Sequence, residues 1–97
     1  MSHYRLTPEA EEDLFQLWAY IARDNLDAAN RVEAAVYEAC DFLASHPFAG
    51  RLRADLAGGF VRFWAVSRFS NYLIVYKPAS RPLAIVRILH GARTWLN

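Results

Sequence analysis

The stretch that most constrains the fold runs from Tyr72 to Arg93 and reads YLIVYKPASRPLAIVRILHGAR. Residues 72–76 and 83–89 are rich in aromatic and β-branched side chains, a composition typical of β-strands. The segment between them contains Pro78 and Pro82, which have no amide hydrogen to donate to a strand ladder. The stretch therefore predicts two strands that are joined by a short turn.

Strict alternation along the second of these strands predicts two faces. One face carries Ala84, Val86, Ile88 and His90, and the other carries Ile85, Arg87 and Leu89. An arginine in so apolar a strand needs water or an anionic partner, because a lone buried charge is costly. We therefore expect function on the face that carries Arg87.

The residues before this stretch predict a short strand, two helices and one further strand. Thr7 is a good N-cap and Pro8 suits a first helical position, so the first helix is expected over about residues 8–23. A second helix is expected over about residues 27–44, capped by Asn25 or Asp27. The predicted strands cover residues 3–6 and 60–66, with a loop over residues 48–59 and a turn over residues 67–71.

The element order is therefore β-α-α-β-β-β, which indicates an α+β fold. A helical hairpin is expected to pack on one face of a small, mainly antiparallel sheet and to leave the other face partly open. A chain of 97 residues suits a single domain, residues 1–97.

Charge is distributed unevenly along the chain, although the net charge is only +1. Residues 1–49 hold three arginines and nine carboxylates, a balance of −6. Residues 50–97 hold eight lysines and arginines against one carboxylate, a balance of +7. Such a chain can present one basic surface to an acidic protein or a nucleic acid, or the two halves can neutralise each other within the fold.

Several classes of function find no support in the residues. A single cysteine, Cys40, within a helical pattern predicts a buried side chain rather than a disulfide or a reactive thiol. The three histidines, His3, His46 and His90, lack the spacing of a metal site, and we expect no cofactor. No apolar run is long enough for a membrane helix and the first residues do not resemble a secretion signal, so a cytoplasmic protein is expected.

One group of residues could bind an anionic macromolecule. It comprises Arg62, Arg68, Arg87, His90 and Arg93, with Tyr72 and Tyr76 on the same strands. Such a group could hold RNA phosphates while a histidine or tyrosine moves the proton of a 2′-hydroxyl. It could equally dock in an acidic groove of a protein.

The helical hairpin, the HPFAG turn at 46–50 and the ending ILHGAR at 88–93 together resemble the ParE toxins of type II toxin–antitoxin systems. These toxins belong to the RelE/ParE superfamily. The resemblance implies a toxin that inhibits DNA gyrase by binding and is not itself an enzyme. It also implies a cognate, ParD-like antitoxin with an acidic C-terminal segment, and no contact with a membrane or directly with nucleic acid.

Two alternatives remain open. In the RelE branch the same fold is a ribosome-dependent mRNA endonuclease, and its catalytic groups here would be Arg62, Arg87, His90 and Arg93. Lys77 is the only lysine and no carboxylate lies near these strands in the sequence, which favours the gyrase interpretation. The other alternative is a non-toxic decoy that binds a related antitoxin.

The predicted binding residues fall into two sets. The target-binding set is Arg62, Arg87, His90, Arg93 and Trp95. The antitoxin-binding set is Leu14, Phe15, Trp18, Ala22, Arg68 and Tyr72. An apolar groove rimmed by arginine would suit an antitoxin segment that has apolar anchors with Asp or Glu between them and that folds on contact.

Overall fold

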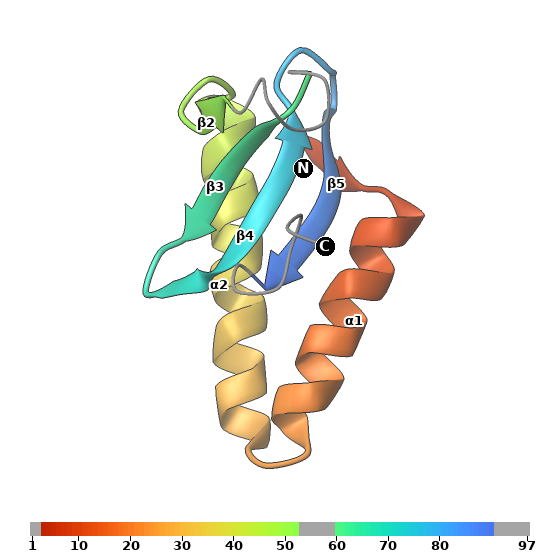
Figure 1. Ribbon diagram of the computed structural model, residues 1–97, viewed down its shortest axis with the longest axis vertical. Coiled ribbons are helices and arrows are strands. Elements are labelled where there is room, and N and C mark those ends of the chain that lie inside the picture. The colour runs from red at the N-terminus through yellow and green to blue at the C-terminus, as the bar shows by residue number, and fades with distance from the viewer. Residues whose placement is uncertain (1–2, 53–59, 91–97) are drawn as a thin grey trace.

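A computed structural model describes residues 3–52 and 60–90 of the chain (Figure 1). Its elements in chain order are β1 (Tyr4–Leu6), α1 (Pro8–Ala22), α2 (Leu26–Ser45), β2 (Arg51–Leu52), β3 (Arg62–Val66), β4 (Phe69–Lys77) and β5 (Leu83–His90). The predicted α+β class is confirmed. The structure adds β2, a two-residue strand within the segment that was expected to be a loop.

Helix α1 begins at Pro8 as predicted, and α2 begins at Leu26, one residue before the predicted start. The Thr7 side chain accepts a hydrogen bond from the Ala10 amide at 3.2 Å, and Pro8 is the first helical residue of α1. The Asn25 side chain accepts from the Ala28 amide at 2.9 Å, so Asn25 rather than Asp27 caps α2. These bonds satisfy amides that the first turn of a helix leaves without an internal partner.

The five strands form one sheet in the order β1-β5-β4-β3-β2. β1 runs parallel to β5, and the other neighbours are antiparallel. The predicted five-residue turn between β3 and β4 is wrong, because Phe69 already pairs with Val66. Only Ser67 and Arg68 remain in the turn, and Arg68, its second residue, takes the left-handed conformation (φ 70°).

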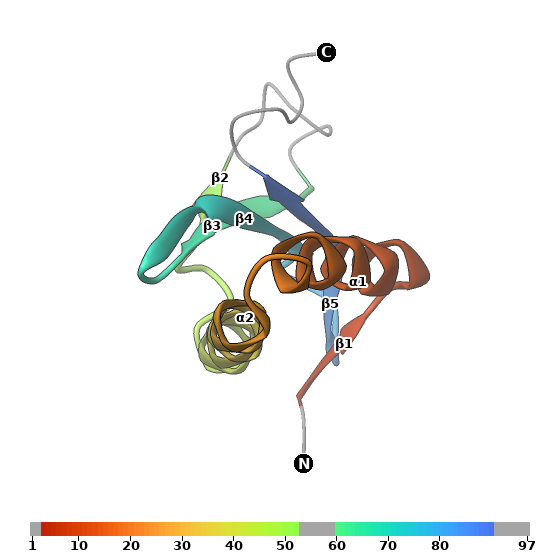
Figure 2. The same cartoon turned by 90° about the horizontal axis from the view of Figure 1, so that it is seen from below.

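The two helices lie on one face of the sheet, as expected (Figure 2). The main core lies between the helices and the sheet. Its fully buried members include Val36, Cys40 and Leu43 of α2 and Ile74, Tyr76 and Ile85 of the sheet. A smaller cluster of Val61, Phe63 and Val75 lies on the opposite face.

The predicted faces of β5 are wrong beyond Ile85, because the strand contains a bulge. Tyr76 pairs with Ile85 while Val75 pairs with Arg87, so one extra residue is inserted in β5. Ile88 consequently joins Ile85 on the helix side. Val86 and Leu89 pack instead against the smaller cluster on the opposite face.

The HPFAG turn is held by contacts with the sheet. The Gly50 amide donates to the Tyr76 hydroxyl at 2.8 Å, and the Arg62 guanidinium donates to the Gly50 carbonyl at 2.8 Å. A Cβ atom at position 50 would lie 2.4 Å from that hydroxyl oxygen and 2.8 Å from the ring carbon Cε1 of Tyr76. Tyr76 is fully buried, so its ring cannot move aside.

Cys40 is a buried core residue, as expected. Burial raises the pKa of the Cys40 thiol to about 12, and the neighbouring Asp41 contributes to the rise. The thiol therefore stays protonated at neutral pH and is a poor nucleophile. Neither of the two helices combines the length and apolar character needed to span a membrane, within the ranges that the structure describes.

Replacing Gly50 by alanine tests the turn. We expect Gly50→Ala to lower the free energy of unfolding by about 1–3 kcal/mol, because the added methyl group overpacks a site next to a buried ring. Urea unfolding measures the change, with Ala49→Ser as the control at the adjacent exposed position. An alanine variant as stable as the control would show that this close packing is unimportant.

Candidate functional site: an ion pair and two grooves beside helix α1

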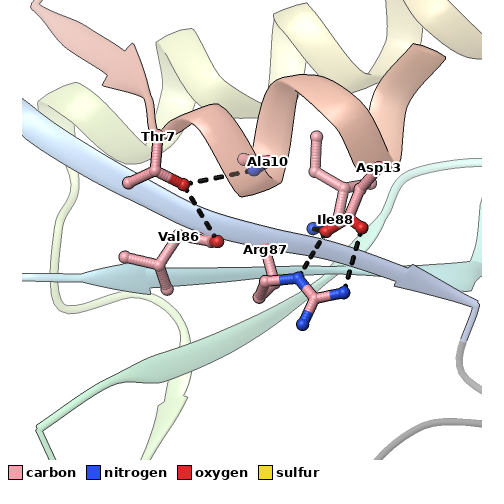
Figure 3. A network of polar contacts seen from close by, with 6 residues as sticks. All are labelled: Thr7, Ala10, Asp13, Val86, Arg87 and Ile88. Carbon is pink, nitrogen blue, oxygen red and sulfur yellow. Dashed lines mark hydrogen bonds and ion pairs between the residues drawn. The ribbon is translucent and has the colours of Figure 1, made fainter.

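Helix α1 is joined to β5 by the carboxylate of Asp13 (Figure 3). Asp13 Oδ2 accepts from Arg87 Nε at 2.6 Å, and Oδ1 accepts from Arg87 Nη2 at 3.0 Å. Oδ2 also accepts from the backbone amide of Ile88 at 3.0 Å. Paired bonds of this kind between arginine and carboxylate are among the strongest polar contacts in proteins.

These contacts occupy a strand edge that would otherwise lack a neighbour. β1 pairs with β5 only as far as Ile85. Beyond that point, the Thr7 hydroxyl donates to the Val86 carbonyl at 3.1 Å, and Asp13 accepts from Ile88. The side chains of the N-cap Thr7 and of Asp13 thus bind backbone groups of β5 that a neighbouring strand would otherwise bind. Such an unpaired edge could otherwise pair with another chain.

The pairing changes what Arg87 can offer a partner. Its side chain is 42% exposed and that of Asp13 is 17% exposed. Hydrogen bonding to Asp13 raises the pKa of Arg87, against the opposing effect of burial. The surrounding shallow depression also contains Glu9 and Glu12, so Arg87 lies in an acidic neighbourhood rather than a basic one.

The other predicted arginines of the described region do not join Arg87. Arg62 pairs with Tyr76 on the helix side of the sheet, whereas Arg87 pairs with Val75, whose side chain lies on the opposite face. The Arg62 guanidinium also lies over the Phe48 ring, 5.3 Å from its centroid. Arg68 lies at the β3–β4 turn. The predicted single group of arginines is therefore not formed by Arg62, Arg68 and Arg87.

His90 and Tyr72 do lie together, at the end of the sheet. They pair across β5 and β4, and their rings meet edge to face with centroids 5.4 Å apart. Asn71 Nδ2 lies 3.4 Å from His90 Nε2, while the buried His90 Nδ1 has no hydrogen-bond partner within the described ranges. These two residues line a groove of about 580 Å³ together with Asp13, Gln16, Leu17, Tyr20, Ile88 and Leu89.

A second groove lies on the other flank of α1, between α1, α2 and β1, and we call it the hairpin groove. It has a volume of about 670 Å³. Its lining is Tyr4, Arg5, Leu6, Glu11, Leu14, Phe15, Trp18, Asn30, Glu33 and Tyr37. Leu14, Phe15 and Trp18, which were predicted to bind the antitoxin, meet here. Ala22, Arg68 and Tyr72 of the same set do not line it.

The charged lining of the hairpin groove differs from the predicted arginine rim. It consists of Glu11 from α1, Glu33 from α2 and Arg5 from β1, a balance of −1. Glu33 and Tyr37 were missed by the sequence interpretation, although they lie four residues apart and so share one side of α2. Their spacing alone could not show which side faces the groove.

Two predicted target-binding residues, Arg93 and Trp95, lie outside the described residues. Within residues 3–52 and 60–90, no group of three or more His, Cys, Asp or Glu side chains could hold a metal ion.

Removing the Asp13 carboxylate tests its structural role. We expect Asp13→Ala to lower the free energy of unfolding by about 1–3 kcal/mol, because it removes bonds from a charged acceptor that solvent only partly screens. Glu12→Ala is the control, since within the described residues the adjacent carboxylate accepts a hydrogen bond from exposed Gln16 alone. Thermal or urea unfolding of both variants gives the comparison, and equal losses would contradict the assignment.

Comparisons with known proteins agree on one family. The family model described as "ParE toxin of type II toxin-antitoxin system, parDE" matches residues 4–95. A protein of Sinorhizobium fredii (strain NBRC 101917 / NGR234) named "Putative toxin Y4kP" is 32% identical over 93 residues, covering 94% of this chain and 90% of that protein.

A solved structure has the same fold. It is titled "Chromosomal ParDE TA system from P. aeruginosa" and superimposes with a TM-score of 0.72 at 19% identity, covering 93% of this chain and 96% of the other. The family match spans nearly the whole chain and includes both grooves. The chain therefore belongs to the ParE family, the toxins of type II toxin–antitoxin systems.

Proposed function

We propose that this ParE toxin acts by binding DNA gyrase and does not itself catalyse a reaction. The observation that carries the proposal is the state of the sheet arginines. A nuclease needs free groups to hold phosphates and to move a proton. Arg62 instead donates to backbone carbonyls of the HPFAG turn, and Arg87 pairs with Asp13. Their engagement favours a binding role over RNA cleavage.

The gyrase contact would then rely on residues other than Arg62. The groove beside His90 offers the rings of His90, Tyr72 and Tyr20 on one surface. Aromatic side chains are frequent anchors in protein interfaces. We propose that this groove contacts gyrase together with Arg93 and Trp95, and that Arg87 contributes through Nη1, which no described residue binds.

Membership of the ParE family implies an antitoxin partner. We propose that a segment of a ParD-like antitoxin neutralises the toxin by binding in the hairpin groove. Phe15 is 59% exposed there and Tyr37 is 40% exposed, so the groove presents apolar surface that a partner would cover. Ala22 and Arg68 would contact other parts of the antitoxin, whereas Tyr72, which was predicted to bind the antitoxin, lies in the groove proposed for gyrase.

Expression of the chain alone in a bacterium tests the target. Gyrase inhibition predicts filamentous cells with an induced DNA-damage response, because blocked gyrase leaves DNA breaks. Nucleoid staining and a damage reporter measure both effects. Rapid arrest of translation with cut transcripts would instead establish the endonuclease alternative. No effect on growth despite good expression would establish the decoy.

A charge placed in the hairpin groove separates toxicity from neutralisation. We expect Phe15→Asp to leave the toxin active but to prevent rescue by the co-expressed antitoxin, because a carboxylate would be buried without a partner. Leu26→Asp is the matched control, since Leu26 is 56% exposed at the start of α2 and does not line the groove. Colony counts with and without antitoxin give the readout. Equal rescue of both variants would mean that the antitoxin binds elsewhere.

A further inference from the structure

The hairpin groove is lined by two carboxylates from facing helices and, among its described residues, by one cation, Arg5 of β1. Glu11 projects from α1 and Glu33 from α2, and both line the groove. The ion pairs of the described region involve Asp13 and Glu38 instead. Two like charges beside apolar surface repel each other, and that repulsion grows when a partner excludes water.

Tyr37 lines the groove together with both carboxylates. Burial raises the pKa of Tyr37, and nearby Glu33, Cys40 and Glu11 raise it further. The groove is therefore lined by negative charge from both helices and not from one alone.

Apolar side chains line the same groove as these carboxylates. Leu14 is buried in the core, Phe15 is largely exposed, and Trp18 donates from Nε1 to Asn30 Oδ1 at 2.9 Å across the hairpin. Arg5 belongs to β1, at the sheet side of the groove. A ligand in this groove therefore contacts aromatic side chains, the carboxylates of Glu11 and Glu33, and the guanidinium of Arg5 on β1.

We propose that the hairpin groove selects an antitoxin segment that carries a lysine or arginine between apolar anchors, with its cationic group between Glu11 and Glu33. The inference rests on the proposed neutralisation by an antitoxin. A cation there relieves the repulsion between the carboxylates, whereas an acidic side chain would add a third like charge. Acidic residues of the same antitoxin segment then bind the guanidinium of Arg5. The segment is therefore of mixed charge, whereas the sequence predicted only Asp or Glu between its apolar anchors.

Charge reversal tests this selection with the antitoxin encoded beside the toxin gene as the probe. We expect Glu11→Lys and Glu33→Lys each to weaken antitoxin binding about tenfold, since each brings a like charge against the antitoxin's cation. Glu12→Lys is the matched control. It makes the same change one residue away, on the flank of α1 that faces Arg87, and should alter the affinity less than about twofold.

Charge reversal in the antitoxin identifies which of its lysines or arginines lies between Glu11 and Glu33. Replacing the antitoxin's lysines and arginines by glutamate one at a time should weaken binding to the unchanged toxin at one position. The same replacement should restore binding to the Glu11→Lys or Glu33→Lys toxin. Isothermal titration calorimetry measures both affinities, and circular dichroism checks that each variant is folded.

Three outcomes would overturn the inference. Tighter or unchanged binding after charge reversal would show that no cation lies between the carboxylates. Self-association of the unchanged toxin that Phe15→Asp abolishes would show that a second copy occupies the groove. Failure of the unchanged toxin to bind the antitoxin at all would overturn the proposed neutralisation itself, and is distinguished by the absence of any wild-type signal.

Discussion

The carboxylate of Asp13 determines where helix α1 lies against the sheet. It accepts two bonds from Arg87 and one from the Ile88 amide, at a part of β5 that β1 does not reach. The Thr7 hydroxyl also donates a hydrogen bond to the carbonyl of Val86, the extra residue at the β5 bulge. The N-terminal half of α1 is therefore held along the strand edge, and Ala10 and Leu14 of the same half pack in the main core.

The two grooves follow from this placement. One flank of α1 forms the hairpin groove with α2 and β1, and the other forms the groove beside His90 with the ends of β4 and β5. A helix held at a sheet edge exposes a flank on each side, whereas a helix centred on the sheet would bury its apolar stripe completely. This geometry leaves room for the two partners proposed above, one on each flank of α1.

Part of the positive charge of the second half of the chain is engaged within the fold. Arg62 closes the HPFAG turn and Arg87 neutralises Asp13, while Arg68 lies 3.7 Å from Glu38 in an exposed pair. The excess of cations in residues 50–97 and of carboxylates in residues 1–49 thus partly cancels between helices and strands. A count of charges along the chain could not reveal this, because Asp13 and Arg87 are 74 residues apart in sequence.

The sequence alone determined the α+β class, the order of the main elements, the cap at Thr7, the buried Cys40 and the resemblance to ParE toxins, and it left the second cap open between Asn25 and Asp27. These features depend on local composition and spacing, which act within a few residues. Tertiary structure alone decided the bulge in β5, the partner of Arg87 and the presence of two carboxylates in the lining of the hairpin groove. Each of these depends on which distant side chains meet. A bulge of one residue reverses the faces of a strand, and two helices must pack before Glu11 and Glu33 can share a groove.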